Sequence, residues 1–412
     1  MQISIGISVN GARTSGSAPV NIVAPGISGT TTIDSVLTST LGGWLNSPTS
    51  YAFQWNRNGS PIPSATTSSY TLVQADSASA ITCVVTATNA FGSTPSTSNT
   101  LTTPTYAAAF TSTWLVTAGE TITLPYEAAG TYSGTIDWGD STTSVNSYDN
   151  RTHTYATAGT KTISITGVTT GFRFNNTGSR LNIRTITNWG TLRLGNGGNY
   201  LNGCSNLTLT TVVGTLDLTG TTNLNGMFWA CSSLTTVNGI NSWNTAAVTS
   251  IGQMFHSCTN FNQALSFNTG AVTNMSNMFQ SCTAFNAALS FSSTASVTNM
   301  YAMFYNCTNF NQPLTFNTVS VTNMGYMFGQ CAFNQNIGSW NVANVTDFEG
   351  FMANKTPATF STTNLDAIYN GWVTVQSSRT ISFGTAKYSA AGVAGRNYLT
   401  TTKLWTITDG GL

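Results

Sequence analysis

Cysteine is the residue type whose spacing in this chain first suggests chemistry, because thiols can form disulfides or bind zinc. Six of the seven cysteines recur at intervals of 27, 27, 24, 25 and 24 residues, while Cys83 stands alone. No histidine or second cysteine accompanies each of the six, so the spacing predicts one cysteine per structural repeat. We therefore interpret them as small buried apolar residues, and expect no metal site and no cofactor. The six are Cys204, Cys231, Cys258, Cys282, Cys307 and Cys331.

Acid–base catalysis is the second chemistry to consider, and the distribution of charge argues against it. Only 6% of the 412 residues are charged, and the formal net charge is +1. Residues 218–346 contain no Asp, Glu, Lys or Arg, and His256 is their one histidine. Because this catalysis needs paired groups with suitable pKa values, we expect no enzyme. The weak charge also excludes a basic face for nucleic acid, and no apolar run is long enough for membrane insertion.

Aromatic and amide side chains are what the repeats offer a ligand. The position after each Met-Phe pair varies along the chain, and it lies off the apolar face, so we expect it to form an exposed column. Tyr301 and Tyr326 form a neighbouring set. Such groups suit sugar rings or protein contacts, although ordinary surface variation explains the same pattern. The column comprises Trp229, His256, Gln280 and Tyr305, followed by Gly329.

The elements that would position these side chains are predicted from the Met-Phe pairs. Around each pair, apolar residues stand at i, i+3, i+4 and i+7, as in Ile251, Met254, Phe255 and Cys258. This spacing predicts a two-turn helix with one buried face, seen five times. Helices packed ~8–10 Å apart would hold the cysteines too far apart for disulfides. The predicted core residues are Met254, Phe255, Cys258, Met278, Phe279, Cys282, Met303, Phe304, Cys307, Met327, Phe328 and Cys331.

Neither two helical turns nor a short extended piece such as Leu265–Phe267 can bury its own apolar face, so stacked copies in a solenoid are expected. The pattern V-T-N-M-x-x-M-F-x-x-C-x-x-F-N-Q, best matched by Val272–Cys282 and Val321–Cys331, resembles the BspA-like leucine-rich repeats of bacterial surface and phage structural proteins. This resemblance implies a solenoid used in adhesion or surface recognition, and it implies no catalysis.

The N-terminal half carries short alternating strands separated by turn clusters, which predicts β-sandwiches. Residues 19–104 resemble a bacterial or phage immunoglobulin-like domain. The resemblance makes Trp55 its core tryptophan and Cys83 its strand cysteine, with the usual disulfide partner missing.

Residues 105–169 resemble a PKD-type domain through Ile136–Asp140, His153–Tyr155 and Thr162–Ile165. That family usually has a glycine where Ser141 stands, so the turn is expected to differ there. Asp137 and Asp140 could be read as a calcium pair, but two carboxylates are few for a shell of six to eight oxygens. A role in turn and strand-end hydrogen bonding is the favoured interpretation.

The predicted fold class is mainly β and multidomain, with two β-sandwiches followed by a leucine-rich-repeat-like α/β solenoid with caps. The C-terminal cap is expected to contain a helix that ends at Gly371. The expected domains are an N-terminal strand and linker at 1–18, the immunoglobulin-like domain at 19–104, the PKD-like domain at 105–169, the solenoid with its N-terminal cap at 170–355, and the C-terminal cap at 356–412.

A surface-type composition without a recognisable export signal at Met1 favours a bacteriophage virion surface protein, as a capsid decoration or a tail or fibre component. The expected partners are other virion proteins and a host-surface glycan or protein, and the chain is expected as a homo-oligomer or in many copies. A bacterial cell-surface adhesin is the alternative. An accessory fragment of a polysaccharide-degrading enzyme is a third reading, for which no segment long enough for a catalytic core remains.

Overall fold

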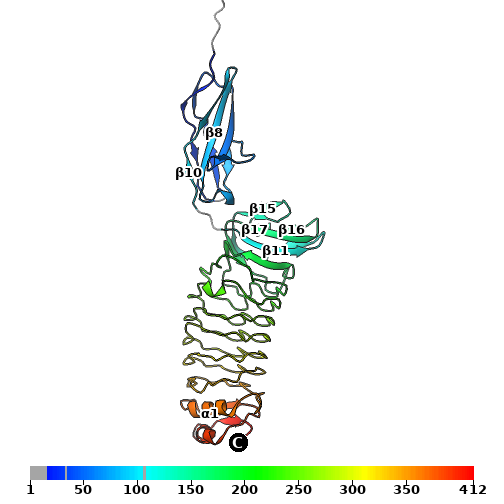
Figure 1. Cartoon of the computed structure of the whole chain (residues 1–412), viewed down its shortest axis with the longest axis vertical. Helices are drawn as coiled ribbons and strands as arrows, with labels where there is room; N and C mark the ends of the chain where they lie inside the picture. Colours follow the sequence, from blue (N-terminus) through cyan, green and yellow to red (C-terminus); the bar gives the residue numbers. More distant parts are fainter. Residues whose placement is uncertain (1–15, 33–34, 105–107) are drawn as a thin grey trace, which may run out of the picture. The chain divides into compact units, whose positions relative to one another are not determined.

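The computed structural model describes residues 16–32, 35–104 and 108–412 (Figure 1). The strand predicted before residue 10 lies outside the described residues. The structure is mainly β, with 28% of residues in strands and 7% in helices. The chain divides into two compact units, Met1–Ala107 and Ala108–Leu412. In the parts that the structure describes, no helix is long and apolar enough to cross a membrane.

The described part of the first unit is built from short antiparallel strands. One sheet has the order β10-β8-β5-β6 with β9 paired to β8, a second has the order β2-β3-β7, and β1 pairs with β4. The elements are β1 (Val20–Val23), β2 (Ile27–Ser28), β3 (Val36–Ser39), β4 (Gly43–Leu45), β5 (Ser50–Arg57), β6 (Ser60–Pro61), β7 (Ser69–Thr71), the 3-10 helix η1 (Gln74–Asp76), β8 (Ala80–Asn89), β9 (Gly92–Thr97) and β10 (Leu101–Thr102).

The core of this unit contains both residues predicted for it. Trp55 on β5 is the direct cross-strand partner of Cys83 on β8, and both side chains are fully buried. They pack with Leu37 and Leu72, which come from the β2-β3-β7 side. The indole N–H of Trp55 donates to the carbonyl oxygen of Thr67 at 2.9 Å, so the one polar atom of this buried ring is satisfied.

The second unit begins with a layer of sheets. The largest has the order β15-β14-β17-β11-β19, beside the pair β12-β16 and the sheet β13-β18-β20. The strands are β11 (Phe110–Val116), β12 (Thr121–Thr123), β13 (Tyr126–Tyr132), β14 (Thr135–Asp137), β15 (Thr143–Val145), β16 (Thr152–Thr154), β17 (Gly159–Ile165), β18 (Thr169–Phe172), β19 (Ile183–Asn188) and β20 (Leu192–Arg193).

The boundary predicted between residues 169 and 170 does not separate two compact bodies. β18 runs across it, and β19, which was expected in the solenoid cap, pairs with β11 of the largest sheet. One hydrophobic core continues from Phe110 in the sheets to Trp405 near the C-terminus. The strands after residue 169 therefore both complete the sheet layer and start the stack of repeats.

The repeats contain turns where the sequence predicted helices. Residues 218–346, all of which the structure describes, hold no α-helix and one 3-10 helix, η2 (Ile240–Ser242). In the Met300–Cys307 segment, every second N–H donates to the next repeat, as Ala302 does to the carbonyl of Gly325 at 2.8 Å. The N–H groups of Met303, Tyr305 and Cys307 donate three residues back, as Tyr305 does to Ala302 at 3.1 Å. The helix prediction is wrong because successive turns reproduce the helical spacing of apolar residues.

The turns need a left-handed residue at fixed places. One such column consists of Gly226, Gln253, Asn277, Ala302, Tyr326 and Gly350, whose φ values lie between 51° and 61°. Just before it, the Asn of V-T-N-M accepts the N–H two residues later, as Asn299 Oδ1 does from Tyr301 at 2.9 Å. This Asx turn explains why asparagine recurs at that position.

Side chains stack from repeat to repeat in the core. The rings of Phe255, Phe279 and Phe304 are parallel, with centroids 5.6–5.7 Å apart. Backbone hydrogen bonds join the repeats directly, so the assumed 8–10 Å separation of the cysteines is wrong. All seven cysteines are nevertheless free. Four repeat thiols, those of Cys231, Cys258, Cys282 and Cys307, donate to a backbone carbonyl of the preceding repeat.

The C-terminal segment covers the last repeat (Figure 1). Its first helix ends at Gly371, as predicted from the sequence, and Ser361 caps its N-terminus by accepting from the N–H of Asn364. The elements are α1 (Thr362–Gly371), β21 (Thr380–Ser382), η3 (Ala390–Gly392), α2 (Val393–Asn397), the π-helix η4 (Tyr398–Thr402) and β22 (Thr406–Thr408).

Candidate binding site on the repeats

The predicted column of variable residues lies along one side of the stack, but it is less exposed than expected. Trp229, His256, Gln280 and Tyr305 are half-buried, and Tyr301 of the neighbouring set is 36% exposed. The turn backbone places these side chains outside the core, because each follows a buried Met-Phe pair and stands two residues before a buried Cys. The surface along the column is therefore formed by half-buried side chains with shallow hollows between them, and not by side chains that project into solvent.

Two of the predicted sets converge on one hollow. Gln280 and Tyr305 of the column and Tyr301 and Tyr326 of the neighbouring set line a cavity of about 230 Å³, together with Asn277 and Ala302. The ring of Tyr326 meets the rings of Tyr301 and Tyr305 edge to face, with centroids 5.8 and 6.1 Å away. We call these residues the tyrosine hollow. It offers ring faces, ring edges and amide groups, and none of its own lining residues is charged.

Glycines in the following repeat make room for the tyrosine rings. A Cβ built on Gly329 would lie 2.9 Å from Cδ2 of Tyr305, and one on Gly350 would lie 2.5 Å from Cδ1 of Tyr326. A Cβ on Gly325 would lie 3.2 Å from Cδ2 of Tyr301. Each ring therefore rests over a glycine 24 residues later, and a larger residue there would displace the ring. Gly329 was named from the sequence as a member of the column, whereas Gly325 and Gly350 were not, although the spacing of all three from the tyrosines equals the repeat length.

Tyr326 occupies a strained position. Its φ is 55°, in the left-handed column that holds glycine in two other repeats, and an aromatic residue adopts this conformation at a cost. Its hydroxyl donates to Oε1 of Glu349 at 2.6 Å, and this carboxylate raises the pKa of the Tyr326 hydroxyl. Strained backbone at a non-glycine residue is often found where that residue binds a ligand.

Trp229 and His256 form a separate pair on the same column. Their rings stack with centroids 4.8 Å apart. Nδ1 of His256 is buried without a hydrogen-bond partner, and burial lowers the pKa of the imidazole. Because the neutral ring is favoured there, His256 serves as an aromatic surface rather than as a cation.

The other residues considered for chemistry lie in structural positions. The twelve predicted core residues of the repeats are buried. Asp137 accepts from the N–H of Gly139 at 2.9 Å, and Asp140 accepts from Thr142 and lies 2.8 Å from Nε2 of His153. Ser141 adopts a φ of 72°, the conformation that favours the glycine expected there. Among the described residues, no three His, Cys, Asp or Glu side chains gather as metal ligands.

Comparison with known proteins adds one family. The family model described as "Mycoplasma protein of unknown function, DUF285" matches residues 170–290, 199–314 and 289–377. These overlapping matches cover just over half of the chain, and they include every residue of the tyrosine hollow. No curated protein and no solved structure matches the chain.

Proposed function

The chain belongs to the DUF285 family, and on this premise we propose that it is a non-enzymatic surface protein whose repeats recognise a ligand through the tyrosine hollow. The observation that carries the proposal is the convergence of Tyr301, Tyr305 and Tyr326 on one cavity, each ring resting over a glycine. Aromatic faces with neighbouring amides suit a neutral polar ligand such as a sugar ring of a host-surface glycan or a polar protein surface.

We further propose finer assignments for the domains. The repeats are BspA-like leucine-rich repeats. The first unit is immunoglobulin-like, which the cross-strand pair of Trp55 and Cys83 supports. The sheet layer that opens the second unit is PKD-like, which the left-handed turn at Gly139 and Ser141 supports. β-sandwich modules of this kind commonly carry a binding domain rather than act on a ligand themselves.

The proposed place of action is the surface of a bacteriophage virion, as a capsid decoration or a tail or fibre component, where neighbouring virion proteins are also partners. Many copies on one particle would turn weak single contacts into firm attachment. A bacterial cell-surface adhesin is the second candidate, and the description of the matched family as a Mycoplasma protein favours it.

Mass spectrometry of density-purified particles from the source lysate separates these two candidates. Recovery in a fixed ratio to the major capsid protein would support the virion assignment, with hundreds of copies indicating decoration and a few to tens indicating the tail. Recovery in the cell-envelope fraction and not in particles would contradict it and support the adhesin.

Binding is tested with the full chain on whole host cells. Tyr305→Ala and Trp229→Ala should leave the melting temperature nearly unchanged, because both side chains are only half-buried, and should weaken adsorption. Adsorption equal to that of the unaltered chain in both variants would remove this side of the stack as a recognition surface.

A further inference from the structure

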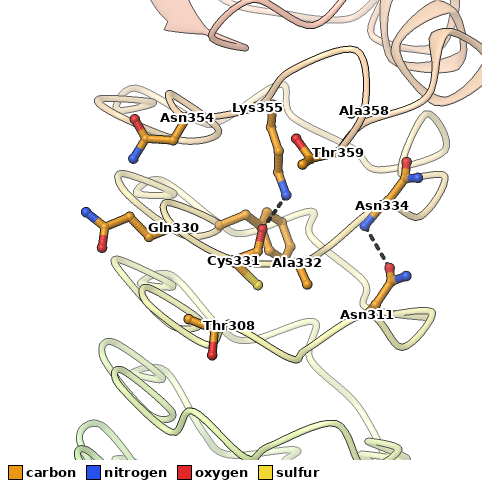
Figure 2. Close-up of a pocket in the computed structure, with 11 residues that line it drawn as sticks. Thr308, Asn311, Gln330, Cys331, Ala332, Asn334, Asn354, Lys355, Ala358 and Thr359 are labelled. Atoms are coloured by element: carbon orange, nitrogen blue, oxygen red, sulfur yellow. Dashed lines mark hydrogen bonds between the residues drawn. The ribbon is translucent and has the colours of Figure 1, made fainter.

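A second cavity lies between the last repeat and the segment that leads into the C-terminal cap (Figure 2). It has a volume of about 530 Å³. Phe328, Cys331 and Lys355 are the buried residues in its lining. The lining also includes exposed residues that connect the cavity with solvent, namely Thr308, Gln330, Asn354, Ala358 and Thr359.

The cavity lies where the repeat becomes one residue shorter. In earlier repeats the Cys and the following Phe are three residues apart, and the Phe N–H donates to the Cys carbonyl, as Phe310 does to Cys307 at 3.0 Å. In the last repeat Cys331 and Phe333 are only two residues apart, so that turn cannot form. The Nζ of Lys355 donates instead to the carbonyl oxygens of Cys331 at 2.5 Å and Phe333 at 2.7 Å.

Lys355 therefore replaces a backbone donor, and it brings an uncompensated charge into the protein. Its side chain stands where the earlier repeats have cysteine, and the residue is 3% exposed. No carboxylate lines the cavity, and no ion pair among the described residues includes Lys355. A buried cation without a counter-charge is costly, so this site is short of one negative charge.

The protonation state of the site follows from its neighbours. Burial lowers the pKa of Lys355 to about 8, which leaves the ammonium form in the majority at pH 7. The titratable group that faces it is the thiol of Cys331, whose pKa burial raises to about 11, so this neighbour is neutral. An ammonium has three donors, and the two carbonyls take two of them.

We propose that this cavity binds a carboxylated sugar, with its carboxylate on the ammonium of Lys355. The remaining N–H of Lys355 supplies the donor, and the ligand's charge supplies the missing compensation. Asn311, Gln330 and Asn354 line the same space, and side-chain amides can donate to or accept from sugar hydroxyls. The volume lies in the range of small-molecule sites. The tyrosine hollow shares no residue with this cavity, so the proposal does not depend on that site.

Calorimetry on the full chain tests the proposal with glucuronate, glucose and acetate as probes. At pH 7 glucuronate should bind at least tenfold more tightly than either glucose or acetate, because glucose lacks the charge and acetate lacks the hydroxyls. The affinity for glucuronate should fall on going from pH 7 to pH 9, as Lys355 loses its proton. Equal affinity for glucuronate and acetate would overturn the sugar assignment, and no binding of glucuronate would overturn the site.

Two variants connect the binding to this cavity. Lys355→Met removes the charge and should abolish glucuronate binding, but it also leaves the carbonyls of Cys331 and Phe333 without their donor and can unfold the last repeat. Ala358→Trp keeps Lys355 and fills the exposed side of the cavity, so it should lose binding at an unchanged melting temperature. Ala90→Trp, at an exposed alanine that lines neither this cavity nor the tyrosine hollow, is the matched control and should bind glucuronate normally. Normal binding by Ala358→Trp would place glucuronate elsewhere and overturn the proposal.

Discussion

The ring of Tyr305 rests over Gly329 of the next repeat, where an added Cβ would come within 2.9 Å of its Cδ2. Gly329 is buried, so an added methyl group has no free space there and the half-buried ring of Tyr305 would have to shift. The geometry of the tyrosine hollow thus depends on a residue that contributes no side chain to it.

Gly329→Ala should therefore displace the Tyr305 ring and weaken ligand binding severalfold, while lowering the free energy of unfolding by about 1–3 kcal/mol through overpacking. Adsorption to host cells and urea denaturation measure the two effects. Gly270→Ala is the control, because its added Cβ would meet only Oδ1 of Asn268, at 3.4 Å. Full adsorption by Gly329→Ala would show that the position of Tyr305 does not matter for binding.

The existence of a repeat and the burial of its cysteines follow from the sequence, whereas the backbone conformation does not. The i, i+3, i+4, i+7 spacing of Ile251, Met254, Phe255 and Cys258 fits a helix and a series of turns equally well. What selects turns is the bonding of every second N–H to the next repeat. These bonds join residues about 24 apart, so no local pattern can reveal them. Glycine or asparagine at three of the six left-handed positions, Gly226, Asn277 and Gly350, was a local signal of turns.

Four residues of the tyrosine hollow, Gln280, Tyr301, Tyr305 and Tyr326, were named from the sequence, but their convergence was not. Tyr301 and Tyr305 stand on two sides of the same turn, and only the directions of their rings bring them together over the glycines. The cavity at Lys355 escaped the sequence analysis because it results from a one-residue shortening after Cys331. The shortening is visible in the sequence, because Cys331 and Phe333 are two residues apart whereas Cys307 and Phe310 are three residues apart.

The thiol of Cys282 donates to the carbonyl oxygen of Phe255 in the preceding repeat, with Sγ and O 2.7 Å apart. Cys282→Ala should lower the free energy of unfolding by about 1–2 kcal/mol, because it removes this contact and leaves a small void in a closely packed core. Cys282→Ser and Cys307→Ala should also be destabilising. Urea denaturation measures the loss. A loss of ligand binding without any change in unfolding would contradict a purely structural role.

His256 should make the stability of the repeats depend on pH. Burial lowers the pKa of its imidazole in the folded chain, so the unfolded chain binds the proton more readily. Stability is therefore complete above the ordinary histidine pKa of about 6.5 and falls as the pH drops below it. Urea denaturation between pH 7.5 and 5 should show this decrease, and His256→Gln should reduce it. An identical pH profile in His256→Gln would exclude this linkage.

The side chain of Tyr326 should contribute to ligand binding, while its left-handed backbone lowers the stability of the fold. Two substitutions can separate these effects. Both Tyr326→Ala and Tyr326→Gly remove the ring, its contacts and the hydrogen bond to Glu349, so both should weaken adsorption. Only glycine relieves the left-handed backbone at φ 55°, so Tyr326→Gly should be about 1 kcal/mol more stable than Tyr326→Ala.

Tyr301 provides the matched control, because it lines the same hollow but is not among the residues with positive φ. There the order should reverse, with Tyr301→Gly about 0.5–1 kcal/mol less stable than Tyr301→Ala, since glycine loses more conformational entropy on folding. If Tyr326 showed the same order as Tyr301, its backbone would not be strained. The backbone of Tyr326 would then not lower the free energy of unfolding, and the geometry of the hollow would follow from the repeat alone.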